Sequence, residues 1–207
     1  MKIEFFGPPG CGKTYVKEKI VGISREEISQ KANNRVLAKV KKLSKYSPIS
    51  LYYSKKLRAM LFNEDLSAVF HDLTISDMLD SIVLVATSYK IGFSSHSILD
   101  EGLVHRIISL GVNYNLSTEK VIEIISFFQP ILKNVDVIFI SASINEILES
   151  IRLRNRKESK MDYFDEYKLE KFVKKYDMIC HKVATYFDFR EIRRQEIDDF
   201  IREKKLL

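Results

Sequence analysis

The sequence has no tryptophan and only two cysteines, Cys11 and Cys180, among its 207 residues. Two cysteines are too few for the disulfide framework of a small secreted domain, and Cys11 stands in a glycine-rich loop where a bridge would block the approach of a ligand. The sequence also lacks an apolar run close to the roughly 20 residues that span a bilayer. We therefore expect a reduced, cytoplasmic protein with no membrane segment and, because the loop begins at residue 7, no signal peptide before it.

The remaining composition predicts one globular domain over residues 1–207, because 45% of the residues are hydrophobic and 30% are charged. The net charge is +6, and the basic residues concentrate at 31–58 and 152–160. A basic protein can bind nucleic acid or phosphorylated small molecules. The Tyr and Phe residues form no RNA-binding signature, so the charge by itself does not favour nucleic acid.

A motif near the start of the chain is the strongest single signal. The apolar run Lys2–Phe6 leads directly into G-x-x-x-x-G-K-T, and a helical pattern follows. In this context the backbone N–H groups of the loop bind phosphate, the ammonium of Lys13 reaches the β- and γ-phosphates, and the hydroxyl of Thr14 binds Mg²⁺. The predicted nucleotide-binding residues are Gly7, Pro8, Pro9, Gly10, Cys11, Gly12, Lys13 and Thr14.

The second candidate site is a short apolar strand that ends in two carboxylates, Asp100 and Glu101. We expect Asp100 to hold Mg²⁺ through water, while one of the two carboxylates accepts a proton from an attacking hydroxyl. The alternative is an acidic helix N-terminus that the helix dipole favours. On the next helix, Arg106 either clamps an anionic acceptor or is a solvated helix arginine, and His105 is expected to be structural or exposed.

The third candidate site is the basic run at residues 152–157. On a continuing helix, Arg152 and Arg156 are four residues apart and share one face. Two guanidinium groups on one face can clamp phosphate oxygens and neutralise the charge that develops during phosphoryl transfer. The alternative is a solvated charge run without a binding role.

Strands that alternate with helices predict an α/β fold in which helices cover both faces of a parallel sheet. The strands are predicted at 2–6, 97–100 and 136–141, with a fourth either near 186–192 or in 66–73. In the first part of the chain, helices are predicted from Thr14 to Val21 and from Ser24 up to Ser47-Pro48, followed by a helix whose inner face consists of Leu51, Leu57, Met60 and Leu61. In the middle of the chain, helices are predicted over 77–90, over 103–110 with an end at Gly111, and over 117–128 with an end before Pro130. The last helices are predicted after Ser143 and over most of the chain from Phe164. Region 24–75 is predicted to be an all-helical insertion.

The order of these motifs resembles the P-loop kinases of small molecules, the nucleoside and nucleotide kinase-like superfamily. The resemblance rests on GPPGCGKT after the first strand, a strand ending in Asp-Glu, then VDVIFISAS, a helix and R-x-R-x-R. It implies a three-layer P-loop NTPase fold with a helical acceptor-binding segment at 24–95 and an arginine-bearing lid at 150–162. It matches Arg152 and Arg156 to the lid arginines, Asp100 to the strand-end acid, and Arg106 to the acceptor-side arginine. The Asp-Arg pair that thymidylate kinases carry at this strand is absent, because the sequence reads Asp100-Glu101-Gly102.

The leading hypothesis is an ATP-dependent phosphotransferase that uses Mg²⁺ and acts on an anionic small molecule such as a nucleotide or a sugar phosphate, or on a nucleoside or sugar. Its expected catalytic residues are Lys13, Asp100, Glu101, Arg152 and Arg156, with Thr14 and Asp100 at the metal and Arg106 at the acceptor. An AAA-type ATPase or nucleotide-dependent switch is the alternative, because this class also combines GPPGxGKT with an Asp-Glu pair. A nucleic-acid-binding regulator is less favoured, because the lysines at 39–56 and Arg58 fit the solvated faces of two helices.

Overall fold

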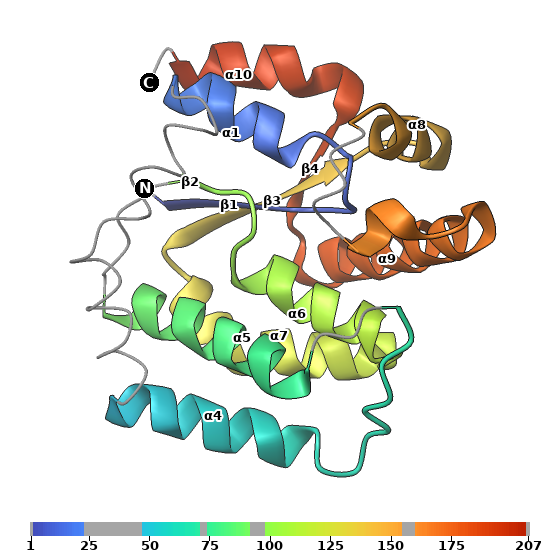
Figure 1. Ribbon diagram of the computed structural model, residues 1–207. Helices are drawn as coiled ribbons and strands as arrows, with labels where there is room; N and C mark the ends of the chain where they lie inside the picture. The colour runs from blue at the N-terminus through green and yellow to red at the C-terminus, as the bar shows by residue number, and fades with distance from the viewer. Residues whose placement is uncertain (1, 23–46, 71–73, 92–97, 155–159, 206–207) are drawn as a thin grey trace, which may run out of the picture.

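The computed structural model describes residues 2–22, 47–70, 74–91, 98–154 and 160–205 (Figure 1). Four strands form one parallel sheet in the order β2-β1-β3-β4. Their bounds are β1 Lys2–Phe6, β2 Ile98–Leu99, β3 Val135–Ser141 and β4 Arg190–Arg193. The α/β prediction is therefore confirmed, and the fourth strand lies at the later of its two predicted places, whereas residues 66–70 form no strand.

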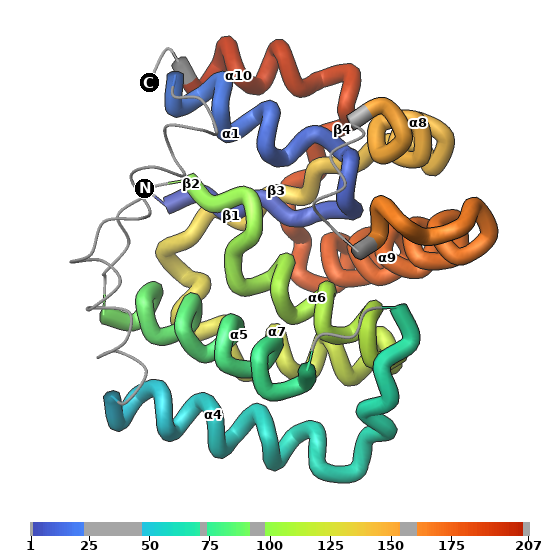
Figure 2. The backbone as a smooth tube through the Cα atoms, viewed as in Figure 1, coloured from blue at the N-terminus to red at the C-terminus, as the bar shows by residue number. Residues whose placement is uncertain are grey.

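Helices cover both faces of the sheet, which makes three layers (Figure 1). One face carries α1 (Lys13–Val21) and α10 (Ile197–Lys205), and the opposite face carries α6 (Leu103–Asn113), α7 (Thr118–Leu132) and α9 (Glu166–Phe187). Further out lie α5 (Ile75–Lys90) and α4 (Pro48–Met60), while α8 (Ile144–Arg154) packs on α9. Two short 3₁₀ turns, η1 (Lys160–Tyr163) and η2 (Arg194–Glu196), precede α9 and α10. The last helix, α10, returns to lie beside α1, the first (Figure 2).

The central strands are apolar on both faces, as a parallel sheet between two helical layers requires. Phe5 and Phe6 of β1 are fully buried, and so are Ile138, Phe139 and Ile140 of β3. The rings of Phe6 and Phe139 stack with centroids 5.2 Å apart across the two strands. Within the described part of the chain, no helix is both long and apolar enough to cross a membrane.

Two helices run past the residues at which the sequence predicted their ends. The first, α6, continues through Gly111, where a Cβ atom would lie 2.3 Å from Cγ2 of Val121. The glycine therefore allows close contact between α6 and α7 and does not end the helix. The second, α7, continues through Pro130, which removes one helical hydrogen bond, to the buried Leu132, whose packing offsets that loss.

The sequence Ser47-Pro48 begins α4, and the preceding helix that it was predicted to end lies outside the described residues. The hydroxyl of Ser47 accepts a hydrogen bond from the N–H of Ser50, and Pro48 occupies the first position of α4, where its missing N–H is not needed. Leu57 is buried, but Leu51, which the sequence placed on the same inner face, is 60% exposed. The helix predicted between Ser24 and Ser47 lies almost entirely outside the described residues.

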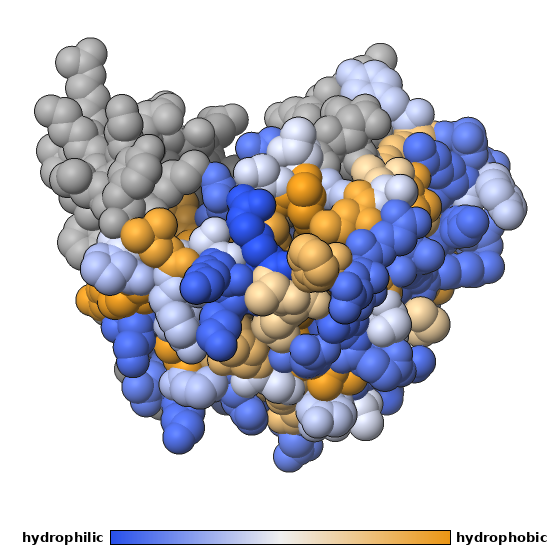
Figure 3. Space-filling view, turned by 90° about the horizontal axis from the view of Figure 1, so that it is seen from below, coloured by the Kyte–Doolittle hydropathy of each residue, from blue (hydrophilic) through white to orange (hydrophobic). Residues whose placement is uncertain are grey.

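The outer face of α4 is mixed in character. It exposes Leu51 and Tyr52 together with the basic side chains of Lys55, Lys56 and Arg58. Seen from below, hydrophilic and hydrophobic residues are interspersed over this side of the molecule (Figure 3). The described basic residues of the insertion are exposed on this helix face, and the lysines at 39–45 lie outside the described residues.

A carboxylate in the middle of β1 joins the sheet to two helices. Glu4 is fully buried, and its carboxylate accepts hydrogen bonds from the N–H groups of Val104 (2.6 Å) and His105 (3.2 Å) in the first turn of α6 and from the hydroxyl of Tyr89 (2.8 Å) on α5. A Cβ atom at Gly102 would lie 2.2 Å from Cδ of Glu4, so only glycine permits this close approach. Burial raises the pKa of Glu4 in spite of these hydrogen bonds. The position of α6 is thus fixed from inside the sheet.

We expect Glu4→Ala to lower the free energy of unfolding by about 2–4 kcal/mol, because it leaves buried N–H and O–H donors without an acceptor. Glu4→Gln should retain most of the stability, since its amide oxygen still accepts from the first turn of α6. Because the pKa of Glu4 is raised in the folded state, its protonation stabilises the fold fully below pH 4.5, and this contribution is lost as the pH rises through the folded-state pKa. Urea unfolding between pH 4 and pH 8 should show that Glu4→Gln removes this slope, and an unchanged slope would contradict the assignment.

Candidate active site

The glycine-rich loop Gly7–Thr14 connects β1 to α1 at the carboxyl end of the central strand. Gly7, Gly10 and Gly12 all have positive φ angles. The side chain of Lys13 is 8% exposed, and its Nζ donates to the carbonyl oxygens of Gly7 and Pro8, each at 2.8 Å. The lysine is therefore folded over its own loop with its charge at the loop's centre.

Arg194 supports this loop from η2. Its Nη1 donates to the carbonyl oxygen of Gly10 (3.4 Å) and to Oγ of Ser150 on α8 (2.6 Å). The guanidinium thus joins the phosphate loop, α8 and the C-terminal part of the chain. The sequence carried no signal for this contact, because it depends on the position of the fourth strand, which the pattern left open.

Asp100 lies directly against the loop. It accepts a hydrogen bond from Oγ1 of Thr14 at 3.1 Å, and its other oxygen is 2.8 Å from Nζ of Lys17 on α1. Burial alone would raise the pKa of the Asp100 carboxyl, but the hydrogen bond and the charge of Lys17, with the bond from Thr14, outweigh it, so the pKa lies below its ordinary value. Asp100 is therefore held as a carboxylate.

The hydroxyl of Thr14 and the carboxylate of Asp100 fit the preference of Mg²⁺ for oxygen ligands. In the described part of the chain, no group of three or more His, Cys, Asp or Glu side chains could hold a metal ion unaided. Thr14 and Asp100 would therefore share the ion with phosphate oxygens and water, as is usual for Mg²⁺ at nucleotide sites.

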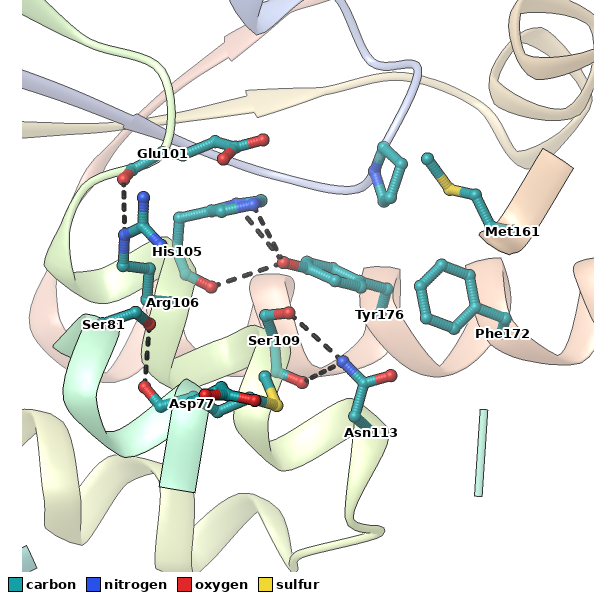
Figure 4. Close-up of a pocket in the computed structure, with 12 residues that line it drawn as sticks. Asp77, Ser81, Glu101, His105, Arg106, Ser109, Asn113, Met161, Phe172 and Tyr176 are labelled. Atoms are coloured by element: carbon teal, nitrogen blue, oxygen red, sulfur yellow. Dashed lines mark hydrogen bonds between the residues drawn. The ribbon is translucent and has the colours of Figure 1, made fainter. Parts of the chain in front are cut away.

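A cavity of about 400 Å³ lies beside the loop, within the size range of small-molecule sites. Pro9 of the loop and Glu101 line it, and its other walls come from α5, α6 and α9 (Figure 4). The α5 wall consists of Asp77, Met78 and Ser81. Asp100 and Glu101 are adjacent in the sequence, but the side chain of Asp100 contacts Thr14 of the phosphate loop, whereas Glu101 lines the cavity.

The α6 wall is a polar stripe on an otherwise apolar helix. His105, Ser109 and Asn113 are spaced four residues apart and therefore lie on one face. Both ring nitrogens of His105 lie 3.3 Å from the hydroxyl of Tyr176. Burial, together with the nearby charges of Lys13 and Arg106, lowers the pKa of His105 well below its ordinary value, so the imidazole is neutral at pH 7.

Arg106 also lines the cavity, as its assignment to the acceptor site requires. Its Nε donates to the backbone carbonyl oxygen of Glu101 at 3.2 Å. This bond brings the guanidinium back over the strand end from which α6 starts. Among the described residues that line the cavity, Arg106 is the one permanent cation, and it is held at the backbone of Glu101.

The α9 wall is aromatic. Phe172 and Tyr176 are both buried and meet edge to face, with ring centroids 5.8 Å apart. Together with Met161 they give the cavity a flat apolar side opposite the polar stripe of α6 (Figure 4). A site of this kind suits a ligand with a planar ring and a few polar groups.

The basic run after α8 does not contribute to this cavity in its described part. The side chain of Arg152 is 56% exposed and forms an ion pair with Glu166 at 2.7 Å. Arg156 lies outside the described residues. The structure thus brings Lys13, Thr14, Asp100, Glu101 and Arg106 together and places Arg152 at the surface.

Sequence reasoning missed most of the cavity. The spacing of His105, Ser109 and Asn113 was a readable signal, but the predicted helix ended at Gly111 and so excluded Asn113. The aromatic wall of α9 carried no local signal, because Phe172 and Tyr176 also fit an ordinary apolar helix face.

No protein-family model matches the chain, and no curated protein sequence matches it. Several solved structures resemble it, and two of them are of deoxyadenosine kinase from M. mycoides. The structure with bound dCTP is 18% identical, with 100% of both chains covered and a TM-score of 0.48. The structure with bound dATP is 19% identical, with 99% of this chain and 98% of the other covered and a TM-score of 0.48.

Both of these structures are of a kinase, the class that the sequence resembles, but a similarity of this degree does not assign an activity. The fold itself is carried by the chain's own features, namely the phosphate loop after the central strand and the parallel strand order. The chain has the three-layer P-loop fold that its sequence predicted.

The contact between Lys17 and Asp100 can be tested through stability. Lys17→Met should lower the free energy of unfolding at pH 7 by about 1–2 kcal/mol, because it removes a hydrogen bond between charged groups. The depressed pKa of Asp100 gives a contribution that is present above pH 3.8 and is lost as the pH falls through the folded-state pKa. The difference from the wild type should therefore shrink in acid.

The matched control is Lys19→Met on the same helix, since Lys19 is exposed and lies over the ring of Tyr15 at 5.5 Å. Chemical denaturation at pH 7 and pH 3 should show a pH-dependent difference for Lys17→Met alone. Equal effects of the two substitutions at both pH values would speak against the ion pair.

Proposed function

We propose that the chain is an ATP-dependent kinase that transfers the γ-phosphoryl group to a hydroxyl of a nucleoside. The observation that supports this most is the position of the cavity. Pro9 of the phosphate loop and Glu101 at the strand edge share its wall, so an acceptor in the cavity lies next to the phosphate-binding loop. Such an arrangement favours transfer to a bound acceptor over transfer to water.

The charges of the cavity support an uncharged acceptor, in contrast to the anionic one expected from the basic composition. Among the described residues that line the cavity, Asp77 and Glu101 supply two carboxylates, Arg106 supplies one cation, and His105 is neutral at pH 7. A phosphorylated acceptor would meet more negative than positive charge there. The flat ring of Phe172 supports an acceptor with a planar ring, which a nucleoside has and a simple sugar lacks.

The roles of the residues follow from their placement. Lys13 binds the transferring phosphoryl group, and Thr14 with Asp100 holds Mg²⁺, which neutralises phosphate charge when bound. Glu101 takes the proton of the attacking hydroxyl, because it faces the cavity while Asp100 is engaged with Thr14 and Lys17. Arg106 keeps this strand end in place through its bond to the Glu101 carbonyl.

The chain is proposed to act as one kinase-like domain over 1–207. The segment 24–95 would bind the acceptor, and its helix α5 supports this by supplying one wall of the cavity. The segment 150–162 is proposed as the lid that brings Arg152 and Arg156 to the phosphates. The exposed pair between Arg152 and Glu166 fits this role, because exposed ion pairs are weak and exchange readily for a phosphate partner.

Lys13→Ala should reduce phosphoryl transfer at least a hundredfold, because it removes the charge that stabilises the transferring group. The fold should remain intact, which circular dichroism and thermal unfolding would check. Lys19→Ala, on the exposed face of α1, is the control and should transfer at the wild-type rate. A Lys13→Ala protein that transfers phosphate normally would end this mechanism.

ATP turnover with and without an acceptor separates the kinase from the ATPase alternative. We expect slow hydrolysis of ATP alone, and transfer of the labelled phosphate to at least one ribo- or deoxyribonucleoside when a panel is added. Nucleoside monophosphates and sugar phosphates serve as the anionic comparison and should be poorer acceptors. Fast hydrolysis without any acceptor, together with ring assemblies in light scattering, would instead favour the AAA-type ATPase.

A further inference from the structure

Asn113, the last residue of α6, carries an unusual polar atom at the end of the cavity. The residue is 2% exposed and lines the cavity. Its amide nitrogen donates to the carbonyl oxygen of Ser109 at 2.8 Å and lies 3.3 Å from Oγ of the same serine. Its carbonyl oxygen, Oδ1, is buried and accepts no hydrogen bond from any described residue.

The orientation of this amide is determined by its neighbour. The backbone carbonyl of Ser109 can only accept a hydrogen bond, so the amide nitrogen, and not the oxygen, must face it. The oxygen therefore points away from Ser109, toward the side on which Phe172 lies (Figure 4). A flip of the side chain would set two acceptors against each other and leave a donor unpaired.

Buried acceptors without a donor are rare, because the atom has lost water and gained nothing in return. In the described part of the chain only one other buried side-chain atom shares this property, Oδ1 of Asp177. That atom does not line the cavity and lies 3.6 Å from Nε2 of His181. Among the described residues that line the cavity, the oxygen of Asn113 is thus the one buried side-chain acceptor without a donor.

The position of Asn113 along α6 limits the shape of that ligand. The helix has 11 residues, so it spans about 16 Å between the Glu101 end of the cavity and the Asn113 end. Hydrogen bonds of about 3 Å at each end leave room for an acceptor about 10 Å long. This length suits a nucleoside whose hydroxyl lies at Glu101 and whose base lies between Asn113 and the ring of Phe172.

We infer that Asn113 selects the acceptor by taking a hydrogen bond from an N–H group on its base, so that bases with an amino group are preferred to the same bases without one. The reaction in this statement rests on the proposed kinase function, whereas the contact rests on the cavity itself. Asn113 is a specificity-determining residue, because it lies far from the phosphate loop. The donor completes the hydrogen bonding of an atom that the fold leaves unpaired.

The first test changes only the ligand. Adenosine and 2′-deoxyadenosine are compared with purine riboside and its 2′-deoxy form, which lack only the exocyclic amino group. Wild-type protein should show a kcat/KM at least tenfold lower for the purine compounds, because the buried oxygen then stays unpaired. Cytidine compared with its analogue that lacks the amino group gives the same test for a pyrimidine.

The second test changes the protein. Asn113→Ala should bring the ratio of kcat/KM between the two members of each pair close to one, with folding checked by circular dichroism. Ser81→Ala is the matched control on the α5 wall, because the hydroxyl of Ser81 already donates to the carbonyl oxygen of Met78 and should not affect this ratio. If Asn113→Ala does not fold, the comparison of ligands on the wild type still decides the inference.

Calorimetric binding of the same compounds separates this inference from the kinase proposal. Equal transfer to adenosine and purine riboside, with equal dissociation constants, would overturn the role of Asn113 and leave the kinase in place. No transfer to any nucleoside, with binding that still depends on the amino group and on Asn113, would overturn the kinase and support the contact. Equal binding without transfer would overturn both.

Discussion

The hydrogen bonds between the buried carboxylate of Glu4 and the first turn of α6 are the constraint on which the site depends. The strand that carries Glu4 leads into the phosphate loop, and the helix that it holds carries one wall of the cavity. Glu4 therefore fixes the glycine-rich loop and the α6 wall of the cavity relative to each other, and its hydrogen bond from Tyr89 fixes α5 as well.

The two acidic residues that follow β2, Asp100 and Glu101, contact different parts of the site. Both residues lie in the bend that follows the last strand residue, Leu99, and their side chains have different partners. Asp100 is turned to Thr14 and Lys17, which keep it ionised, and Glu101 is turned to the cavity. The different contacts of the two side chains support separate proposed roles for them, a choice that the sequence left open.

Features that depend on local chemistry could be predicted from the sequence. The phosphate loop, the strands at 2–6 and 136–141 and the helices that begin after Ser117 and Ser143 need only neighbouring residues to specify them. The errors arose where a distant contact decides the outcome. Gly111 stays helical because α7 packs against it, and Glu4 reads as an irregularity in an apolar run until its partners 85 to 101 residues away are known. The cavity is made by three helices from separate parts of the chain, so no single stretch could reveal it.

The origin of the α5 wall has a consequence for how such a protein can diversify. Helix α5 belongs to the segment of the chain between α1 and β2. Among the described residues, β2 pairs with β1 through Ile98 and Leu99 alone. Changes of sequence or length between α1 and β2 alter one side of the cavity while the order of the strands and the phosphate loop stay as they are. The sheet and the proposed phosphate loop can thus stay constant while the segment that contains α5 varies. New acceptor preferences can then arise without loss of the loop.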